Sequence, residues 1–245
     1  MVRFVHACRR LGLVAAGAAV VTVAGSLAPA VAMPGSATRA AAPSSSYRVI
    51  DLGTLPGASD STALAMNERG DVVGQSGGRA VLWRNGRIVD LGTPAGSFSS
   101  AVDINEHGDV VGYSLIGGTY QAFLWRRGRL VDLRALPGDQ WSIPNAINDR
   151  GEIVGYSNEP TLRAELWRPD GTPVDLTAAT GLLQVNDLDN SGRLVGEVAP
   201  AGMNTIPVLW SRGQTTVLTD RSGSASAMND RGEVTGYDRT YARAG

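Results

Sequence analysis

The chain has 245 residues, of which 43% are hydrophobic and 18% charged, with 31 glycines and a formal net charge of −1. This composition predicts a folded protein with a substantial core, because chains so rich in apolar residues do not belong to the disordered class. Every basic residue is an arginine, and the 22 arginines are balanced by 23 acids. No positive field is therefore available for a nucleic-acid backbone, and nucleic acid is excluded as an expected partner.

The N-terminal segment predicts an export signal followed by a linker. Arginines precede an apolar run over 11–27, and an Ala-Val-Ala triplet at 30–32 has the small-x-small pattern of a cleavage site. We expect a signal peptide over 1–32, a flexible linker over 33–46 and a secreted domain over 47–245 with no membrane contact after cleavage. An uncleaved anchor is the alternative, although the run is shorter than the roughly 20 residues of a membrane span. The general and twin-arginine export routes both stay open.

The rest of the chain is an internal repeat. The motif Asn-Glu-Arg-Gly-Asp-Val-Val-Gly at 67–74 returns four more times in closely related form, and tryptophans recur with the same spacing. Two markers that share a period of about 40 residues predict stacked or circular units that cannot bury their faces alone. We expect both markers to be structural. The turn glycines are Gly70, Gly108, Gly151, Gly192 and Gly232, and the repeated tryptophans are Trp83, Trp125, Trp167 and Trp210.

Each unit predicts four short strands. In the first unit they cover 63–67, 71–76, 79–84 and 87–91, which are rich in Val, Ile, Leu and Trp and are separated by glycine turns. The Asn-x-x-Gly turn predicts a glycine with positive φ, and Asn85-Gly86 is a strong hairpin signal. Four antiparallel strands in about 40 residues are typical of a β-propeller blade.

The two ends of the repeat region complement one another. Residues 47–53 match the fourth strand of the other units, whereas 225–229, 233–238 and 241–243 match first, second and third strands with no fourth. We therefore predict an all-β fold, a β-propeller of about five four-stranded blades that closes by pairing the N-terminal strand with the last blade. Closure would leave no exposed sheet edge. The alternative is a truncated arc of a larger propeller.

These residues resemble the extracellular HAF-repeat family, which is named for a His-Ala-Phe triplet before Leu-Trp. The resemblance rests on Asp-Leu-Gly-Thr-Leu-Pro-Gly at 51–57, on the repeated turn motif at 67–74 and on Gln-Ala-Phe-Leu-Trp at 121–125. It implies export and a repeat, propeller-like fold, and it implies no settled activity. The family histidine is replaced by Arg79, Gln121, Arg163 and Ile206.

Two acids break the repeat near the expected centre of the ring. Asp103 and Asp187 stand where the other units have Ala65, Ala146 and Ala227. Sugar-cleaving propellers use carboxylates near a central channel, so this pair is a candidate ligand site and the basis for a glycoside-hydrolase-like alternative. The competing interpretation is that neighbouring N–H groups, or Asn145 and Asn186, bind both carboxylates.

A second candidate site contains the one tryptophan outside the repeat. Trp141 follows Asp139 and Gln140 in a connection between two blades, and an aromatic side chain beside a carboxylate and an amide is typical of a carbohydrate or peptide contact. A tryptophan folded onto its own blade is the alternative. The two candidate sites together comprise Trp141, Asp139, Gln140, Asp103 and Asp187.

No catalytic residue, metal site or cofactor is expected. Cys8 lies in the signal, and His107 is the one histidine of the mature chain, so a zinc site or a Ser-His-Asp triad lacks its ordinary residues. The sequence therefore predicts a secreted, monomeric, non-catalytic binding propeller whose partner is a surface glycan or an exported protein. A hydrolase on a five-bladed ring is the alternative.

Overall fold

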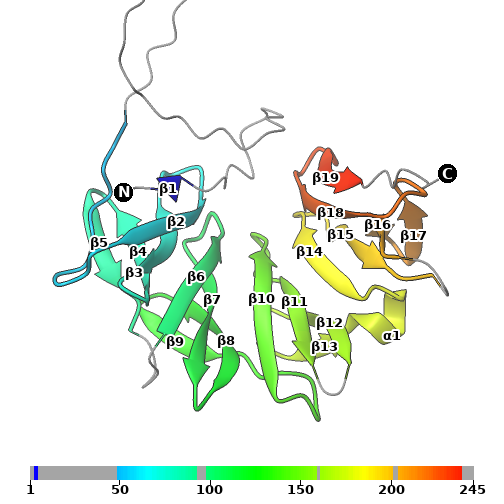
Figure 1. Ribbon diagram of the computed structural model, residues 1–245, viewed down its shortest axis with the longest axis horizontal. Helices are drawn as coiled ribbons and strands as arrows, with labels where there is room; N and C mark the ends of the chain where they lie inside the picture. The colour runs from blue at the N-terminus through cyan, green and yellow to red at the C-terminus, as the bar shows by residue number, and fades with distance from the viewer. Residues whose placement is uncertain (1–2, 5–48, 93–97, 159–160, 201–203, 239–245) are drawn as a thin grey trace, which may run out of the picture.

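The computed structural model describes residues 3–4, 49–92, 98–158, 161–200 and 204–238. These residues form 19 strands and one short helix. The strands make five sheets that follow one another along the chain, and Figure 1 shows the sheets in an arc from β2 to β19. The prediction of an all-β propeller with four-stranded blades is confirmed.

Each of the first four blades contains four consecutive antiparallel strands, with the first strand innermost. Blade one contains β2 (Ser61–Met66), β3 (Val72–Ser76), β4 (Arg79–Arg84) and β5 (Arg87–Asp90). Blade two contains β6 (Phe98–Ile104), β7 (Val110–Ile116), β8 (Thr119–Arg126) and β9 (Arg129–Asp132). Blade three contains β10 (Trp141–Ile147), β11 (Ile153–Asn158), β12 (Leu162–Trp167) and β13 (Pro173–Asp175).

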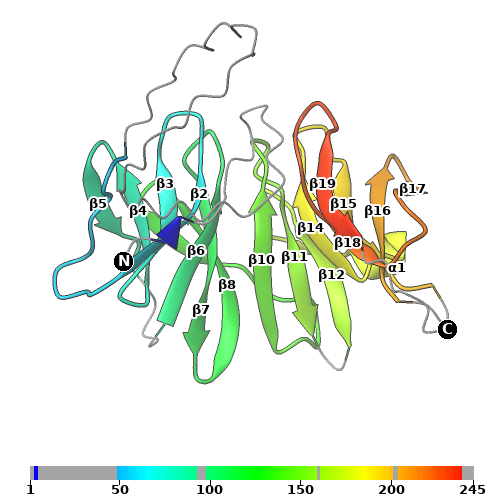
Figure 2. The ribbon, with the colours of Figure 1, turned by 45° about the horizontal axis from the view of Figure 1, so that its top comes forward.

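Blade four has four strands, and blade five has two among the described residues. Blade four contains β14 (Gln184–Leu188), β15 (Leu194–Val198), β16 (Ile206–Ser211) and β17 (Gln214–Val217), and blade five contains β18 (Gly223–Met228) and β19 (Val234–Asp238). The predicted signal peptide is described only at β1 (Arg3–Phe4), which lies parallel to β2, and the predicted linker lies outside the described residues. The inner strands β6, β10 and β14 lie side by side (Figure 2).

One helix, α1 (Leu176–Thr180), lies in the connection between blades three and four. Asp175 caps its N-terminus by accepting from the N–H of Ala178 at 3.1 Å, and Gly181 ends it with a φ of 75°. The amino-acid pattern does not predict this helix, because five residues are too few to show a helical period.

The hydrophobic core lies between the blades. Val111 and Leu124 of blade two share a buried cluster with Ile147, Ile153 and Trp167 of blade three. Three other buried clusters join blades one and two, blades three and four, and blades four and five in the same way. A single unit therefore cannot bury its own apolar face, as the repeat period predicted.

Three of the four repeated tryptophans on the third strands contribute to these clusters. Trp167 is fully buried, and its indole N–H donates to the carbonyl of Arg134 at 2.7 Å. Trp83 donates to the carbonyl of Gly53 at 3.3 Å, and Gly53 holds the corresponding position before blade one. Trp125 and Trp210 are partly buried against neighbouring clusters.

The Asn-x-x-Gly turns link the blades through a ladder of hydrogen bonds. The Nδ2 of Asn67 donates to the carbonyl of Asn105, and Asn105 and Asn148 donate in turn to the carbonyls of Asn148 and Asp189, each at 3.1 Å. The Oδ1 of Asn67 accepts from the N–H groups of its own turn. All five turn glycines have positive φ, as predicted: Gly70 (78°), Gly108 (81°), Gly151 (77°), Gly192 (84°) and Gly232 (85°).

The glycine at the end of each repeat motif, such as Gly155, allows close packing instead of a turn. Its replacement tests how tightly the second strand packs against the inner strand. A Cβ at Gly155 would overlap the carbonyl oxygen of Ile143 on the paired strand, whereas a Cβ at Gly70 meets nothing within 4 Å. We expect Gly155→Ala to destabilise the fold by about 3 kcal/mol, because neither strand backbone can yield to the overlap. Gly70→Ala should cost about 1 kcal/mol, the strain of its positive φ. Urea unfolding of both variants measures this, and equal losses would contradict the steric role.

The predicted pairing of 47–53 with the last blade is not confirmed. Residues 49–52 form no strand, and Val49 and Ile50 are 79% and 55% exposed. A fourth strand pairs with a third strand, and 241–243, the expected third strand of blade five, lie outside the described residues. Gly53 and Leu55 instead bond to Trp83 and Ser76 of blade one. Ring closure is therefore not confirmed, and the alternative of a larger arc stays open.

Candidate functional site

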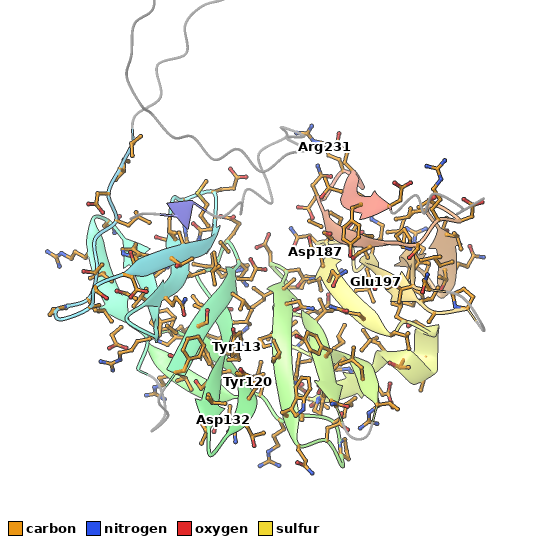
Figure 3. All side chains as sticks on the ribbon, viewed as in Figure 1. Tyr113, Tyr120, Asp132, Asp187, Glu197 and Arg231 are labelled. Carbon is orange, nitrogen blue, oxygen red and sulfur yellow. The ribbon has the colours of Figure 1, made fainter. Side chains whose placement is uncertain are left out.

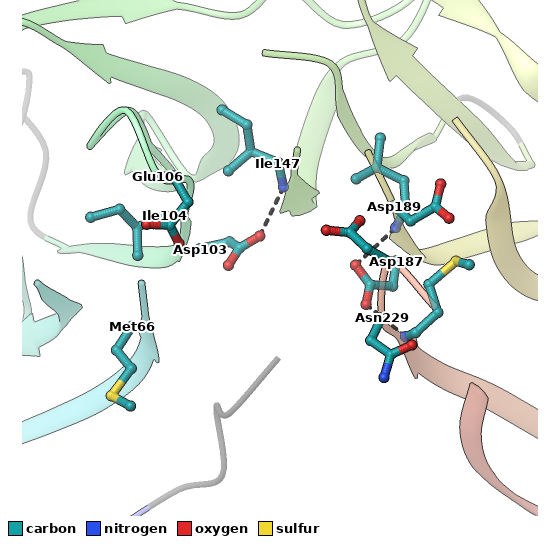
Figure 4. A pocket seen from close by; sticks show the side chains of 11 residues that line it. Met66, Asp103, Ile104, Glu106, Ile147, Asp187, Asp189 and Asn229 are labelled. Carbon is teal, nitrogen blue, oxygen red and sulfur yellow. Dashed lines mark hydrogen bonds between the residues drawn. The ribbon is translucent and has the colours of Figure 1, made fainter. Parts of the chain in front are cut away.

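The inner strands bring Asp103 of β6 and Asp187 of β14 to a small central cavity (Figure 4). Both residues are buried, with exposures of 5% and 2%. The Oδ2 of Asp103 accepts from the N–H of Ile147 at 2.8 Å, and the Oδ2 of Asp187 accepts from the N–H of Met228 at 2.9 Å. Each donor lies on the inner strand of the next blade, so each carboxylate connects two blades.

The central cavity is too small for a substrate. Its volume is about 30 Å³, which holds about two water molecules at 10–15 Å³ each. Pockets for small molecules have roughly ten times that volume or more. The geometry of Asp103 and Asp187 supports the interpretation in which neighbouring N–H groups bind them, and it does not favour sugar cleavage at this place.

The opposite end of the blades carries the residues that differ most between repeats. At this end the inner strands begin, and the hairpins between the second and third strands lie beside them. We term this end the loop face. The Asn-x-x-Gly turns and the central cavity lie toward the other end.

Trp141 lies on the loop face as the first residue of β10. Its ring meets that of Tyr156 edge to face, with centroids 5.7 Å apart and an interplanar angle of 84°. It is partly exposed, so part of the indole remains accessible. The structure therefore places Trp141 at a strand end beside a second aromatic ring, whereas the sequence analysis placed it within a loop.

Asp139 and Gln140, which were grouped with Trp141 on sequence grounds, do not form one site with it in the structure. Gln140 is exposed. The side chain of Asp139 is fully buried, forms an ion pair with Arg163 and accepts from the hydroxyl of Ser157. Both partners lie on blade three, so Asp139 fixes the connection to its blade and presents no carboxylate to the solvent.

Further aromatic side chains of blades two and three lie on the same face. Tyr113 contacts Phe98 at 6.2 Å and Tyr120 at 5.4 Å between ring centroids, and Figure 3 shows Tyr113 and Tyr120 beside each other. Burial raises the pKa of Tyr156, and the nearby Tyr113 and Tyr120 raise it further. We term these five residues, Phe98, Tyr113, Tyr120, Trp141 and Tyr156, the aromatic patch.

A polar groove of about 500 Å³ lies across blades three to five. Among the described residues, its lining contains amides, hydroxyls, one carboxylate and one tyrosine ring, with no arginine. The lining residues are Asn145, Gln184, Asn186, Glu197, Ser224, Ser226 and Tyr237.

Strand register explains why the groove and the patch share one face. Tyr156, Glu197 and Tyr237 hold the same repeat position, because each follows the glycine of its second strand and pairs with an inner-strand residue near the loop face. Asn145 and Asn186 are the extra residues of β-bulges on two inner strands. Bulges re-aim side chains, and here they aim amides into the groove.

The polar groove was not predicted from the sequence, although its residues occupy two recurring positions of the repeat. The bulge position reads Leu64, Val102, Asn145, Asn186 and Ser226 in successive blades, and the position after the second-strand glycine reads Gln75, Tyr113, Tyr156, Glu197 and Tyr237. The bulge position changes from apolar residues to amides and a hydroxyl along the chain, and the second position gains an acid in blade four. Comparing the blades at these positions shows polar residues gathering in the later blades, although the bulges that bring them together are known only from the structure.

The described residues offer little to a metal ion. Among them, no three His, Cys, Asp or Glu side chains converge on a site that could hold one. His107 lies in the turn of blade two, where its N–H donates to Oδ1 of Asn105 at 3.0 Å. No helix within the described ranges is long and apolar enough to cross a membrane.

Comparison with known proteins identifies the fold. No protein-family model matches the chain, and no curated protein does. A putative TolB from Agrobacterium tumefaciens is similar in structure, with a TM-score of 0.55 and 14% identity over 77% of this chain and 78% of that one. The fold is that of a β-propeller. At such identity the similarity extends to the fold alone.

Two further structures match less well. TolB from Acinetobacter baumannii has a TM-score of 0.45 and 13% identity over 69% of this chain. The match spans 42% of that protein's length. A putative gluconolactonase has a TM-score of 0.41 and 14% identity over 70% of this chain and 74% of that one.

Proposed function

We propose that the protein is an exported, non-catalytic binding propeller whose ligand contacts the loop face. The observation that carries this proposal is that the loop face combines a partly exposed aromatic patch with a polar groove of about 500 Å³. That volume lies within the range of small-molecule sites, and the mixture of aromatic and polar side chains is typical of them. The ligand is a surface glycan or a segment of another exported protein.

The enzyme alternative receives less support. A glycosidase needs two carboxyl groups that flank a sugar, and the two acids that break the repeat are buried and bonded to the backbone of the next blade. The polar groove contains one carboxylate, Glu197, among its described residues. Binding without turnover is the outcome that these contacts favour.

The proposal of export rests on the N-terminal sequence. Arginines, an apolar run and a small-x-small site precede the repeat, and the resemblance to extracellular HAF-repeat proteins agrees with them. We propose that the mature protein begins at Met33, acts as a monomer outside the cell, and belongs to that family.

Trp141→Ala tests the proposed function. The mature protein is first screened on glycan and peptide arrays, and the affinity for the best ligand is then measured by calorimetry. We expect the variant to weaken binding by more than about 1 kcal/mol, because an exposed aromatic anchor loses its contact area. Its unfolding free energy should fall by only about 1 kcal/mol, the value of the edge contact with Tyr156.

The conservative variant Trp141→Phe is the control, because it keeps an aromatic ring against Tyr156. We expect Trp141→Phe to retain most of the affinity. If Trp141→Ala unfolds the protein, or leaves the affinity of the folded fraction unchanged, the aromatic patch is part of the scaffold and the proposed site is wrong. Product formation from an array sugar would favour the hydrolase.

A further inference from the structure

The polar groove has a chemical character that the aromatic patch lacks. Amides and hydroxyls dominate its lining, and among the residues that the structure describes Glu197 is its one charged group, with neither arginine nor lysine beside it. Groups that both donate and accept hydrogen bonds match a ligand rich in hydroxyls. The lone negative charge disfavours anionic ligands, including phosphates and uronic acids, because like charges repel in a partly desolvated site.

The groove amides are held in place before any ligand arrives. The Nδ2 of Asn145 donates to the carbonyl of Val185 at 2.7 Å, and the Nδ2 of Asn186 donates to the carbonyl of Ala225 at 2.8 Å. Each bond crosses to the next blade, which fixes the side chain and leaves its Oδ1 as an acceptor. Binding to such fixed groups loses little side-chain entropy, so the hydrogen bonds contribute more fully to affinity.

One aromatic ring lines the groove, and a second holds the same repeat position two blades earlier. Tyr237, a residue that is about half exposed, belongs to the lining on blade five. Tyr156 holds the equivalent position of blade three, where it contacts Trp141. A sugar ring has an apolar face and a hydroxyl rim, and it is complementary to aromatic faces combined with amide groups.

We infer that the polar groove binds a neutral glycan, with Gln184 and the bulge amides of Asn145 and Asn186 as its hydrogen-bonding groups. This inference rests on the proposed binding function and names the ligand class for it. The glycan would extend from the groove across Tyr156 to Trp141, because β10 carries Asn145 in the groove and Trp141 at its loop-face end.

The test uses the mature chain with neutral oligosaccharides, their uronic-acid counterparts and a set of peptides. Gln184→Ala removes a groove amide and leaves in place the interblade bonds of Asn145 and Asn186. We expect it to weaken binding of the best neutral oligosaccharide about fivefold, the effect of one lost hydrogen bond. Glu197→Gln should leave neutral binding within about twofold and strengthen binding of the acidic counterpart about threefold, since it removes the repulsion.

Gln75→Ala is the matched control, because Gln75 holds in blade one the position that Glu197 holds in blade four, outside the groove. We expect it to bind like the native protein. If Gln184→Ala and Gln75→Ala have equal effects, the glycan binds elsewhere and the inference is wrong, although loss of binding in Trp141→Ala would still support the proposed function. If only peptides bind, the ligand class is wrong and the binding function stands. If nothing binds, both fail.

Discussion

The Glu165→Gln variant should lose most of the pH dependence of stability that the native protein shows between pH 5 and 8. Glu165 lies on β12 with 0% exposure, and neither of its carboxyl oxygens has a hydrogen bond of regular geometry to the described residues. The nearby guanidinium of Arg163 does not neutralise Glu165, because it forms ion pairs with Asp139 and Asp175. A buried carboxyl group in this position stays neutral by keeping its proton.

The direction of the effect follows from the pKa. Burial raises the pKa of Glu165 from 4.5 to about 8, and the negative charges of Asp139 and Asp175 add to the shift, while Ser157 and Arg163 oppose it. In the unfolded chain the group loses its proton near pH 4.5, so between pH 4.5 and 8 the folded state binds one proton more than the unfolded state. Stability therefore falls as pH rises through this window, by about 1.4 kcal/mol per pH unit.

The accumulated penalty above pH 8 is on the order of 5 kcal/mol for this buried group. We expect Glu165→Gln to be close to the native stability at pH 5 and more stable than the native protein by roughly that amount at pH 9. Urea unfolding at a series of pH values measures both. Glu197→Gln on blade four controls for the loss of a negative charge from a partly exposed position. Parallel pH profiles for the native protein and Glu165→Gln would contradict the assignment.

Two other acids with shifted pKa values affect the stability of the fold at lower pH, outside the range from pH 5 to 8. Burial by itself raises the pKa of Asp71, but hydrogen bonds from Arg84 and Asn67 more than offset it and hold that pKa below its usual value. Asp189 is similar, with bonds from Arg193 and Ser191 that lower its pKa. The stability that a lowered pKa contributes is present above about pH 4 and is lost as the pH falls further. The slope between pH 5 and 8 therefore reports on Glu165.

The repeat made the blades predictable, because strands and turns are local. The Asn-x-x-Gly turn fixes where one strand ends and the next begins, and its positive φ at Gly70 follows from sequence alone. The burial of Asp139 could not be predicted in this way, because it depends on Arg163, which lies 24 residues away in sequence. Ring closure cannot be derived from local sequence for the same reason, because it requires a contact between the two ends of the repeat.

The polar groove shows a second limit of sequence reasoning. A bulge has no residue signature of its own, so the sequence did not reveal that Asn145 and Asn186 stand outside the regular alternation of the inner strands. The aromatic patch was found in part, through Trp141, because a tryptophan outside the repeat is conspicuous. Tyr156, its ring partner, follows a repeat glycine and was hidden within the motif.

Trp167→Ala should be among the most destabilising substitutions in the repeat, at about 3 to 5 kcal/mol. Trp167 is fully buried between blades two and three, and its removal leaves a cavity lined by Val111, Leu124 and Ile147. It also deprives the carbonyl of Arg134 of its indole donor. The interface between the two blades then loses both its largest side chain and a bond that fixes the connection.

Trp210→Ala provides the comparison, because Trp210 holds the same repeat position in blade four but is only partly buried. We expect it to cost about half as much, since part of its surface is in water in the folded state. Thermal unfolding should place Trp167→Ala on the order of 10 °C below the native protein, as each kcal/mol shifts the melting temperature of a domain this size by about 2 to 4 °C. Similar losses for the two variants would show that burial between blades is not the source of the stability, and that the tryptophans act mainly within their own sheets.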